Sequence, residues 1–555
     1  MRWLPAVLLS ALLGCDDGAT PSSGGMPDAA VDQAAVDAAR DMAPEVAVDG
    51  AAAVAVVAAA GPDQAVDVGA QVLLDGSASQ GAHSFQWDFG DGRRQEAPGA
   101  EPAVTVRYVA PGRYRAVLTV YSADGRRRTD GALITVTHPP RHTPQHSATL
   151  AAVDAHRVVA LSTDGATLTV VDTETLTATR RATGPQPRRL AVRDGRWVGV
   201  TRPDDDLVEI HDLDGGAVEE RPMGPGAAPF GIVALGDDFA VTLQGPGVVA
   251  VGQHRWPVGP DLRGIAALPD GRLAVTRWRS TPAQGELWAL DPASGATTPW
   301  ALAFDPQLAS DTEIGGVPTW LDQVVVSPAG TEAAVPALQA NVGQGLFLNG
   351  ERLDFDLALR AVVAFIDPVT GAERFEQRKQ FDGRGFASAA AYSPRGDYLY
   401  VATRGSRTVE RLDRLTGTAS GTLLDVGFAP EGLLVHGGRL WVEASLSRAL
   451  VVYDLDAFDT GADPVARVPL VDAEPLEPAL RRGKVLFNDS ADPRLSRDGY
   501  IACAHCHLDG DGDNLVWDFT DRGEGLRNTL SLLGRAGTGH GPLHWSANFD
   551  EVQDF

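Results

Sequence analysis

A repeat of about forty residues between residues 145 and 458 constrains the fold of this 555-residue chain more than any other feature. Each unit joins two apolar strands by an Asp/Gly turn and ends on a strand that closes with aspartate, as in VALSTDGATLTVVDTETL and YLYVATRGSRTVERLDRLTG. Units of short strands at this period are typical of β-propeller blades. The closing positions are Asp172, Asp212, Gly252, Asp291, Asp367, Asp413 and Asp454.

The steps between these positions predict seven blades. Five of the six steps are 39 to 46 residues long, whereas the step from Asp291 to Asp367 is 76 residues long. We interpret the long step as one blade with an insertion at Val342 to Leu357, which lacks a strand pattern, although two degenerate blades also fit. The repeats resemble YVTN-type propellers, a resemblance that implies an architecture but no particular function.

A separate β-sandwich is predicted for residues 60–137. In SFQWDFGDG the aromatic residues Phe85, Trp87 and Phe89 fall on one face of a strand, and further apolar residues alternate in the strands after it. The stretches GPDQAVDVGAQVLLDGSAS, WDFGDG and APGRYRAVLTV resemble a PKD domain, an immunoglobulin-like module. That resemblance implies a spacer or adhesion module on a cell surface.

The start of the chain predicts export and lipidation. MRWLPAVLLSALLGC has one positive charge and an apolar run too short to span a bilayer, so residues 1–15 are interpreted as a signal peptide. Its last four residues resemble a bacterial lipobox, which predicts acylation of Cys15; the alternative is a chance cysteine in an ordinary signal peptide. Residues 16–59 are rich in Ala and Asp and poor in aromatic residues, so we expect a disordered tether. The sequence therefore predicts a periplasmic, outer-membrane or cell-surface lipoprotein that meets the membrane only through its lipid.

The charge of the chain restricts its partners. A formal net charge of −26 and a pI of about 4.8 mean that a polyanion is repelled over most of the protein, so nucleic acid is excluded as a partner.

Residues 474–555 predict a small α-helical cytochrome c domain. Apolar residues at helical spacing follow Pro478, and the stretch IACAHCHLDG contains two cysteines three residues apart followed by a histidine. Cys503 and Cys506 are spaced to take the two thioether bonds of haem c, and the adjacent His507 to bind the iron from the proximal side. A thiol redox pair and half of a zinc site are the competing interpretations.

The same region resembles the N-terminal haem domain of the dihaem cytochrome c peroxidase and methylamine-utilisation family. The similar stretches are RRGKVLFNDS, DGYIACAHCHLDG, RNTLSLLG and HGPLHWSANFDEVQDF. The resemblance implies an oxidoreductase that passes electrons between two haems, with Trp545 as an electron relay and Asn528 at a calcium-binding position. Only one CxxCH motif is present, so enzyme activity stays an open question, and a second haem is expected on a redox partner protein or in a missing domain.

The second axial ligand of the expected haem is assigned among two histidines. All four methionines precede the haem segment, which leaves His544, favoured because it adjoins Trp545, and His540 as the second choice. The alternative is that His544 only forms a hydrogen bond with a loop.

Two functions from different classes follow. The first is an exported c-type cytochrome that transfers electrons through one covalent haem c. The alternative is a surface-anchored binding or adhesion protein, in which the PKD and propeller modules recognise a surface polymer or a protein and the haem segment has no function.

Overall fold

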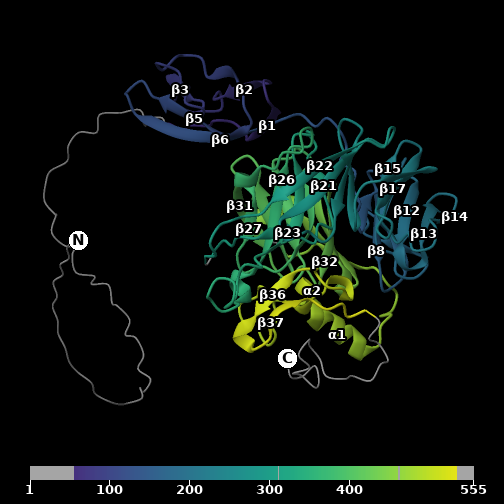
Figure 1. Cartoon of the computed structure of the whole chain (residues 1–555). Helices are drawn as coiled ribbons and strands as arrows, with labels where there is room; N and C mark the ends of the chain where they lie inside the picture. Colours follow the sequence, from purple (N-terminus) through teal and green to yellow (C-terminus); the bar gives the residue numbers. More distant parts are fainter. Residues whose placement is uncertain (1–54, 311, 461–462, 534–555) are drawn as a thin grey trace, which may run out of the picture. The chain divides into compact units, whose positions relative to one another are not determined.

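The computed structural model describes residues 55–310, 312–460 and 463–533, and Figure 1 shows that these residues form mainly β-structure. The chain divides into two units, Met1–Ala55 and Val56–Phe555, and the second unit holds all the elements described here.

The first domain is a small β-sandwich, as the alternating apolar residues predict. One sheet has the strand order β1-β6-β5-β3 and the other pairs β2 with β4. Trp87 is fully buried between them, and its indole N–H donates to Pro102 O at 3.2 Å. The strands are β1 Gln64–Asp67, β2 Gln71–Asp75, β3 Ser84–Asp88, β4 Ala103–Arg107, β5 Gly112–Tyr121 and β6 Arg127–Thr137.

Seven sheets follow between Leu150 and Pro469 in the described part of the chain, and each is built from consecutive strands. The predicted β-propeller is thereby confirmed. Blade 1 contains β7 Leu150–Ala152, β8 Arg157–Ser162, β9 Thr167–Asp172 and β10 Ala178–Ala182; blade 2 contains β11 Leu190–Arg193, β12 Trp197–Arg202, β13 Leu207–Asp212 and β14 Val218–Pro222; blade 3 contains β15 Pro229–Leu235, β16 Asp238–Leu243, β17 Val248–Val251 and β18 His254–Pro257. Blade 4 contains β19 Leu262–Ala267, β20 Leu273–Arg277, β21 Gln284–Leu290 and β22 Thr297–Ala303; blade 5 contains β23 Val317–Thr319, β24 Val325–Val326, β25 Ala333–Ala340, β26 Leu359–Ile366 and β27 Lys379–Phe381. Blade 6 contains β28 Ala387–Tyr392, β29 Tyr398–Thr403, β30 Thr408–Asp413 and β31 Thr418–Leu423; blade 7 contains β32 Pro430–His436, β33 Arg439–Ala444, β34 Ala449–Asp454 and β35 Ala466–Pro469.

The repeated aspartates stabilise the turn after the third strand of a blade. In blade 1, Glu174 N and Thr175 N donate to Asp172 Oδ1 at 3.0 and 2.7 Å. Asp291 and Asp367 accept backbone N–H groups in the same way. A short side-chain acceptor at this place replaces the partners that the turn backbone lacks, which explains why aspartate recurs in the repeat.

The long step of the repeat is one blade with an insertion. Blade 5 has the strand order β23-β25-β26-β27, with β24 also paired to β25, and residues 341–358 separate β25 from β26. The interpretation as two degenerate blades is therefore wrong.

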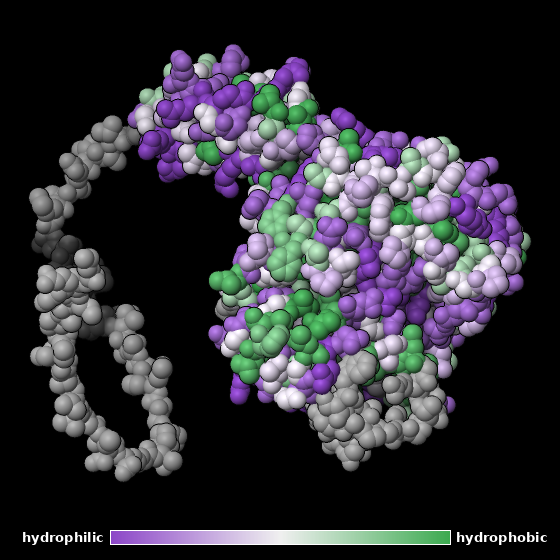
Figure 2. All heavy atoms as spheres, in the orientation of Figure 1, coloured by the Kyte–Doolittle hydropathy of each residue, from purple (hydrophilic) through white to green (hydrophobic). Residues whose placement is uncertain are grey.

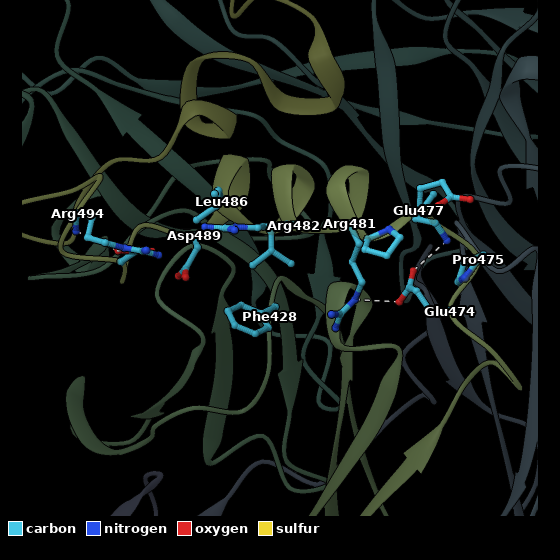
Figure 3. A pocket seen from close by; sticks show the side chains of 13 residues that line it. Phe428, Glu474, Pro475, Glu477, Arg481, Arg482, Leu486, Asp489 and Arg494 are labelled. Atoms are coloured by element: carbon cyan, nitrogen blue, oxygen red, sulfur yellow. Dashed lines mark hydrogen bonds and ion pairs between the residues drawn. The ribbon is translucent and has the colours of Figure 1, made fainter. Parts of the chain in front are cut away.

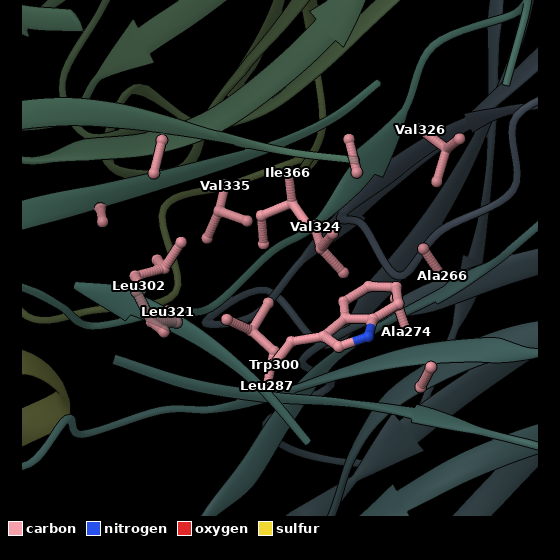
Figure 4. Close-up of a cluster of buried hydrophobic side chains, with 14 of the residues drawn as sticks. Ala266, Ala274, Leu287, Trp300, Leu302, Leu321, Val324, Val326, Val335 and Ile366 are labelled. Atoms are coloured by element: carbon pink, nitrogen blue, oxygen red, sulfur yellow. The ribbon is translucent and has the colours of Figure 1, made fainter. Parts of the chain in front are cut away.

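The core of the propeller lies between neighbouring blades. Figure 4 shows the cluster between blades 4 and 5, where small residues such as Ala266 and Ala274 face larger ones such as Leu287, Trp300 and Ile366. Segment 145–148 also lies between non-adjacent blades, because Ser147 N donates to Ile265 O of β19 and Leu190 N of β11 donates to Ala148 O. The chain itself thus fills part of the centre of the propeller.

The predicted α-helical cytochrome c domain is wrong. Within the described residues there are two α-helices, α1 Pro478–Asn488 and α2 Cys503–Cys506, followed by a hairpin of β36 Val516–Phe519 and β37 Gly525–Asn528. We call residues 474–533 the C-terminal segment. Its buried side chains Leu508, Leu515 and Trp517 do not form a separate core but join a cluster with propeller residues. Figure 1 shows the segment in yellow against the blades, and no helix in the described ranges is long and apolar enough to span a membrane.

Candidate functional site

The CxxCH motif lies where the C-terminal segment packs on the propeller. Cys503 is exposed at the first turn of α2, and Cys506 packs against the cluster that contains Trp278, Trp320 and Trp517. Burial raises the pKa of the Cys506 thiol well above its ordinary value and also raises that of Cys503. Because the thiolate is the reactive form of cysteine, this environment does not favour a thiol redox pair.

His505 fixes this motif to the propeller, a role that the sequence did not suggest. Trp320 Nε1 donates to His505 O at 2.7 Å, and Ala502 N donates to His505 Nδ1 at 2.8 Å. The other ring nitrogen lies 3.2 Å from the backbone nitrogen of Phe386 in blade 6. Burial lowers the pKa of His505 to about 3, so its imidazole is neutral at physiological pH. His507 ends α2, and its backbone N–H donates to Cys503 O at 3.0 Å.

The prediction of haem c is wrong. Among the residues that the structure describes, no group of three or more His, Cys, Asp or Glu side chains could hold a metal ion. The space around Cys506 is taken by protein, because Leu508, Leu515 and Trp517 pack there together with Trp320. A close-packed apolar cluster of this kind leaves no volume for a macrocycle beside Cys506.

The remaining predicted site residues either form no site with the CxxCH motif or lie outside the residues that the structure describes. Asn528 is exposed at the end of β37, and none of the described residues forms a calcium-binding group around it. Cys15, His540, His544 and Trp545 lie outside the described residues.

Two glycines of blade 6 make room for the docked motif. A Cβ atom added at Gly385 would lie 2.7 Å from Ser490 Oγ and 3.0 Å from His505 Cε1. At Gly405 the corresponding distances are 2.7 Å to Ser490 Oγ and 2.9 Å to His505 Nε2. The close contact between this blade and the C-terminal segment therefore depends on the absence of two side chains.

We expect Gly405→Ala to loosen the C-terminal segment. Overpacking of a buried contact costs about 1–3 kcal/mol, which predicts a rise of about 5- to 150-fold in the rate at which a maleimide modifies Cys506. Peptide mass mapping separates Cys506 from the exposed Cys503. Gly483→Ala is the matched control, since a Cβ there meets nothing within 4 Å. Equal Cys506 rates in the two variants would contradict the steric role of Gly405.

Glu443, a buried residue of the propeller, is a second titratable group whose pKa is shifted by burial. Glu443 of β33 accepts a hydrogen bond from Thr149 Oγ1 at 3.1 Å, and Glu431, paired with Arg404 at 2.8 Å, lies in the same region. Burial and the charge of Glu431 raise the pKa of Glu443 well above its ordinary value. Glu443 is therefore protonated more readily in the folded protein than in the unfolded chain.

We expect Glu443→Gln to remove a pH dependence of stability. A raised pKa in the folded state contributes stability below the unfolded value of 4.5, and this is lost as pH rises toward the folded pKa. The free energy of unfolding of the glutamine variant should rise relative to that of wild type by up to about 1.4 kcal/mol per pH unit above pH 5. Melting temperatures from pH 5 to 8 test this, with Glu351→Gln at an exposed position as control. Parallel curves for wild type and Glu443→Gln would show that Glu443 is ionised in the folded protein.

An open groove of about 820 Å³ borders α1 (Figure 3). Phe428 and Leu486 form part of its apolar wall, and Arg481, Arg482 and Arg494 form part of its polar wall. Two of these arginines are neutralised, because Arg481 pairs with Glu474 at 2.9 Å and Arg494 pairs with Asp492 at 2.5 Å. The groove therefore has no strong charge preference.

An exposed apolar patch lies on the insertion of blade 5 and the hairpin β36–β37. Figure 2 shows it as a green area over these elements. Phe347 at the tip of the insertion is 69% exposed. The backbone N–H groups of Phe347 and Leu348 donate to Asp518 Oδ2 at 2.7 and 3.0 Å, so the hairpin holds the tip in place. We call this surface the apolar patch; its members are Leu346, Phe347, Leu348, Val516 and Leu526.

Comparisons with known proteins identify the first domain by its family. A family model for the PKD domain matches residues 53–137, and no curated protein matches the chain. Hydrazine synthase of Kuenenia stuttgartiensis is 18% identical with a TM-score of 0.44, over 55% of this chain and 93% of that one. Virginiamycin B lyase of Staphylococcus aureus (11%, TM-score 0.36, 55% and 97% covered) and AztD of Citrobacter koseri (13%, TM-score 0.35, 70% and 96% covered) are also similar. The chain therefore contains a PKD domain, and its β-propeller rests on the sheet topology alone, since similarities this low carry no argument.

Proposed function

We propose that this chain is an exported binding protein, anchored at the cell surface through Cys15, that binds another protein through the apolar patch. The expected signal peptide and the tether expected before residue 55 support the location, and the PKD domain supports display away from the membrane. The apolar patch is the observation that carries the proposal.

The composition of the apolar patch favours a protein partner. Three consecutive large apolar side chains are 46%, 69% and 46% exposed at Leu346, Phe347 and Leu348. Contiguous exposed apolar surface of this kind marks interaction sites, because its burial on binding is favourable. The hydroxyl groups of a polysaccharide would lose hydrogen bonds to water against such side chains, whereas the apolar centre of a protein surface would not.

The rigidity of the apolar patch also suits binding. Asp518 fixes the backbone of the insertion tip, and Phe355, at the base of the insertion, lies 6.2 Å from the Trp517 ring of the hairpin. A surface that is already ordered loses less conformational freedom when it binds.

Site-specific photo-crosslinking on intact cells tests this function. A benzophenone amino acid at position 347 should yield one discrete product with a second protein. Val109 of the PKD domain, which is 86% exposed, is the matched control position and should yield none.

The product at position 347 should also disappear when Leu346 and Leu348 are both replaced by serine. A product that contains two copies of this chain would mean that the apolar patch binds a second copy of the chain and not another protein. Absence of any product at position 347, or equal products at 347 and 109, would contradict the proposed function.

A further inference from the structure

The C-terminal segment places two carboxylates among arginines of the propeller. Asp509 Oδ1 lies 3.2 Å from Arg188 Nη1, and Asp509 Oδ2 lies 2.7 Å from Arg263 Nη1. Asp511 Oδ2 lies 2.8 Å from Arg279 Nη1. We call residues 509–513, with the sequence DGDGD, the acidic turn, and Arg188, Arg263 and Arg279 the arginine triad.

Propeller groups hold two arginines of the triad without the help of the acidic turn. The Arg263 guanidinium lies 3.2 Å from the ring centre of Trp278 and 3.9 Å from that of Phe230. Arg279 Nε donates to Asp261 Oδ2 at 2.7 Å. Cations that are oriented by their own domain form a prepared site for an anion.

The acidic turn is only partly buried where it contacts the arginine triad. Asp509 and Asp511 are 18% and 29% exposed, so the site opens to solvent at this point. A ligand from outside can therefore reach the position that the acidic turn occupies.

The acidic turn occupies the site in a constrained backbone conformation. Asp509 and Asn514 have φ values of 58° and 62°, in the left-handed region that glycine adopts more easily. The turn lies between the buried anchors Leu508 and Leu515. Leu508 and Leu515 thus hold both ends of the turn in the apolar cluster.

We propose that the arginine triad is a binding site for an acidic peptide segment whose carboxylates are separated by one intervening residue, and that the acidic turn fills this site within the chain. Asp509 and Asp511 show the spacing that the site accepts, and the three arginines donate to the carboxylates of the ligand. The site is separate from the apolar patch, so the two proposals fail or succeed independently.

Binding of a labelled peptide to the full chain tests the proposal. The probe is fluorescein-Asp-Gly-Asp-Gly-Asp, and its control is the same peptide with asparagine in place of aspartate. Asp509→Ser/Asp511→Ser removes both carboxylates from the site. By fluorescence anisotropy this variant should bind the acidic probe at least about tenfold more tightly than wild type, whose own carboxylates must first leave the arginines. Adding Arg279→Gln should weaken binding about tenfold or more, whereas Arg482→Gln on exposed α1 should change it less than about twofold.

The state of the segment is checked in the same samples by maleimide modification of Cys506. Slow modification together with no binding of the acidic probe would overturn the proposal, as would binding that Arg279→Gln leaves unchanged. If maleimide modifies Cys506 of the serine variant rapidly, Asp509→Asn/Asp511→Asn replaces that variant in the binding measurement, because asparagine retains the shape of the turn. If Cys506 of that variant is also modified rapidly, binding of excess probe to the wild-type protein is measured instead. Failure of the probe to bind wild type would equally overturn the proposal.

Discussion

Arg263→Met is expected to destabilise the folded chain by about 3–5 kcal/mol, because it removes one partner from a buried charge network. The guanidinium contacts Asp509 at 2.7 Å, lies 3.7 Å from Asp322, and is 6% exposed. Methionine keeps the apolar contacts with Phe230 and Trp278 but leaves two carboxylates without this cation. Denaturant unfolding followed by tryptophan fluorescence measures the loss.

A double-mutant cycle with Asp509→Asn isolates the pair. Burial acts to raise the pKa of Asp509, but the charges of Arg188, Arg263 and Arg404 lower it well below its ordinary range, so Asp509 is ionised in the folded protein. The two substitutions together should therefore cost less than the sum of the single losses. Arg255→Met, at an exposed position, should stay within about 0.5 kcal/mol of wild type. Additive losses would mean that the Arg263–Asp509 pair contributes no coupling energy and that Arg263 acts through Asp322 and its packing.

Trp320→Ala is expected to cost about 3–5 kcal/mol and to expose Cys506. The indole is fully buried, lies 4.7 Å from the Trp278 ring, and donates to His505 O at 2.7 Å. Its loss opens a cavity in the cluster shared by the propeller and the C-terminal segment. Unfolding curves measure the first effect and maleimide modification of Cys506 measures the second.

Two further variants separate the causes of this effect. Trp320→Phe retains a ring but leaves His505 O without its donor, which should cost about 1–3 kcal/mol. Trp441→Ala removes another fully buried indole, in the cluster between blades 7 and 1, and should destabilise the propeller to a similar degree without faster modification of Cys506. If Cys506 reacted equally fast in Trp320→Ala and Trp441→Ala, Trp320 would have no specific role in docking the segment.

The CxxCH motif shows where local sequence misleads. Cys503, Cys506 and His507 have the spacing that haem attachment requires, and α1 begins at Pro478 as the apolar spacing predicts. Whether a cofactor fits beside them depends on what fills the neighbouring volume. Here Trp320, which precedes the motif by nearly two hundred residues, occupies it together with Leu508 and Trp517. No property of the motif itself signals that packing.

The sequence by itself determined the blades and the sandwich. Strand alternation, the turn after each third strand and the aspartate at Asp172, Asp291 or Asp367 are set by neighbours within a few residues, so a repeat of about forty residues is enough to predict them. The same locality identified the insertion of blade 5 but not the exposure of Phe347, which depends on Asp518 far along the chain.

Only the tertiary structure decided how the C-terminal segment is used. Asp509 and Asp511 meet Arg188, Arg263 and Arg279 across sequence separations of 321, 246 and 232 residues. Residue spacing along the chain carries no information about such contacts, because they arise when closure of the propeller brings residues of blades 2 and 4 together around the acidic turn. The acidic turn therefore resembles any polar loop in the sequence, and it becomes a bound carboxylate pair only once the blades are assembled.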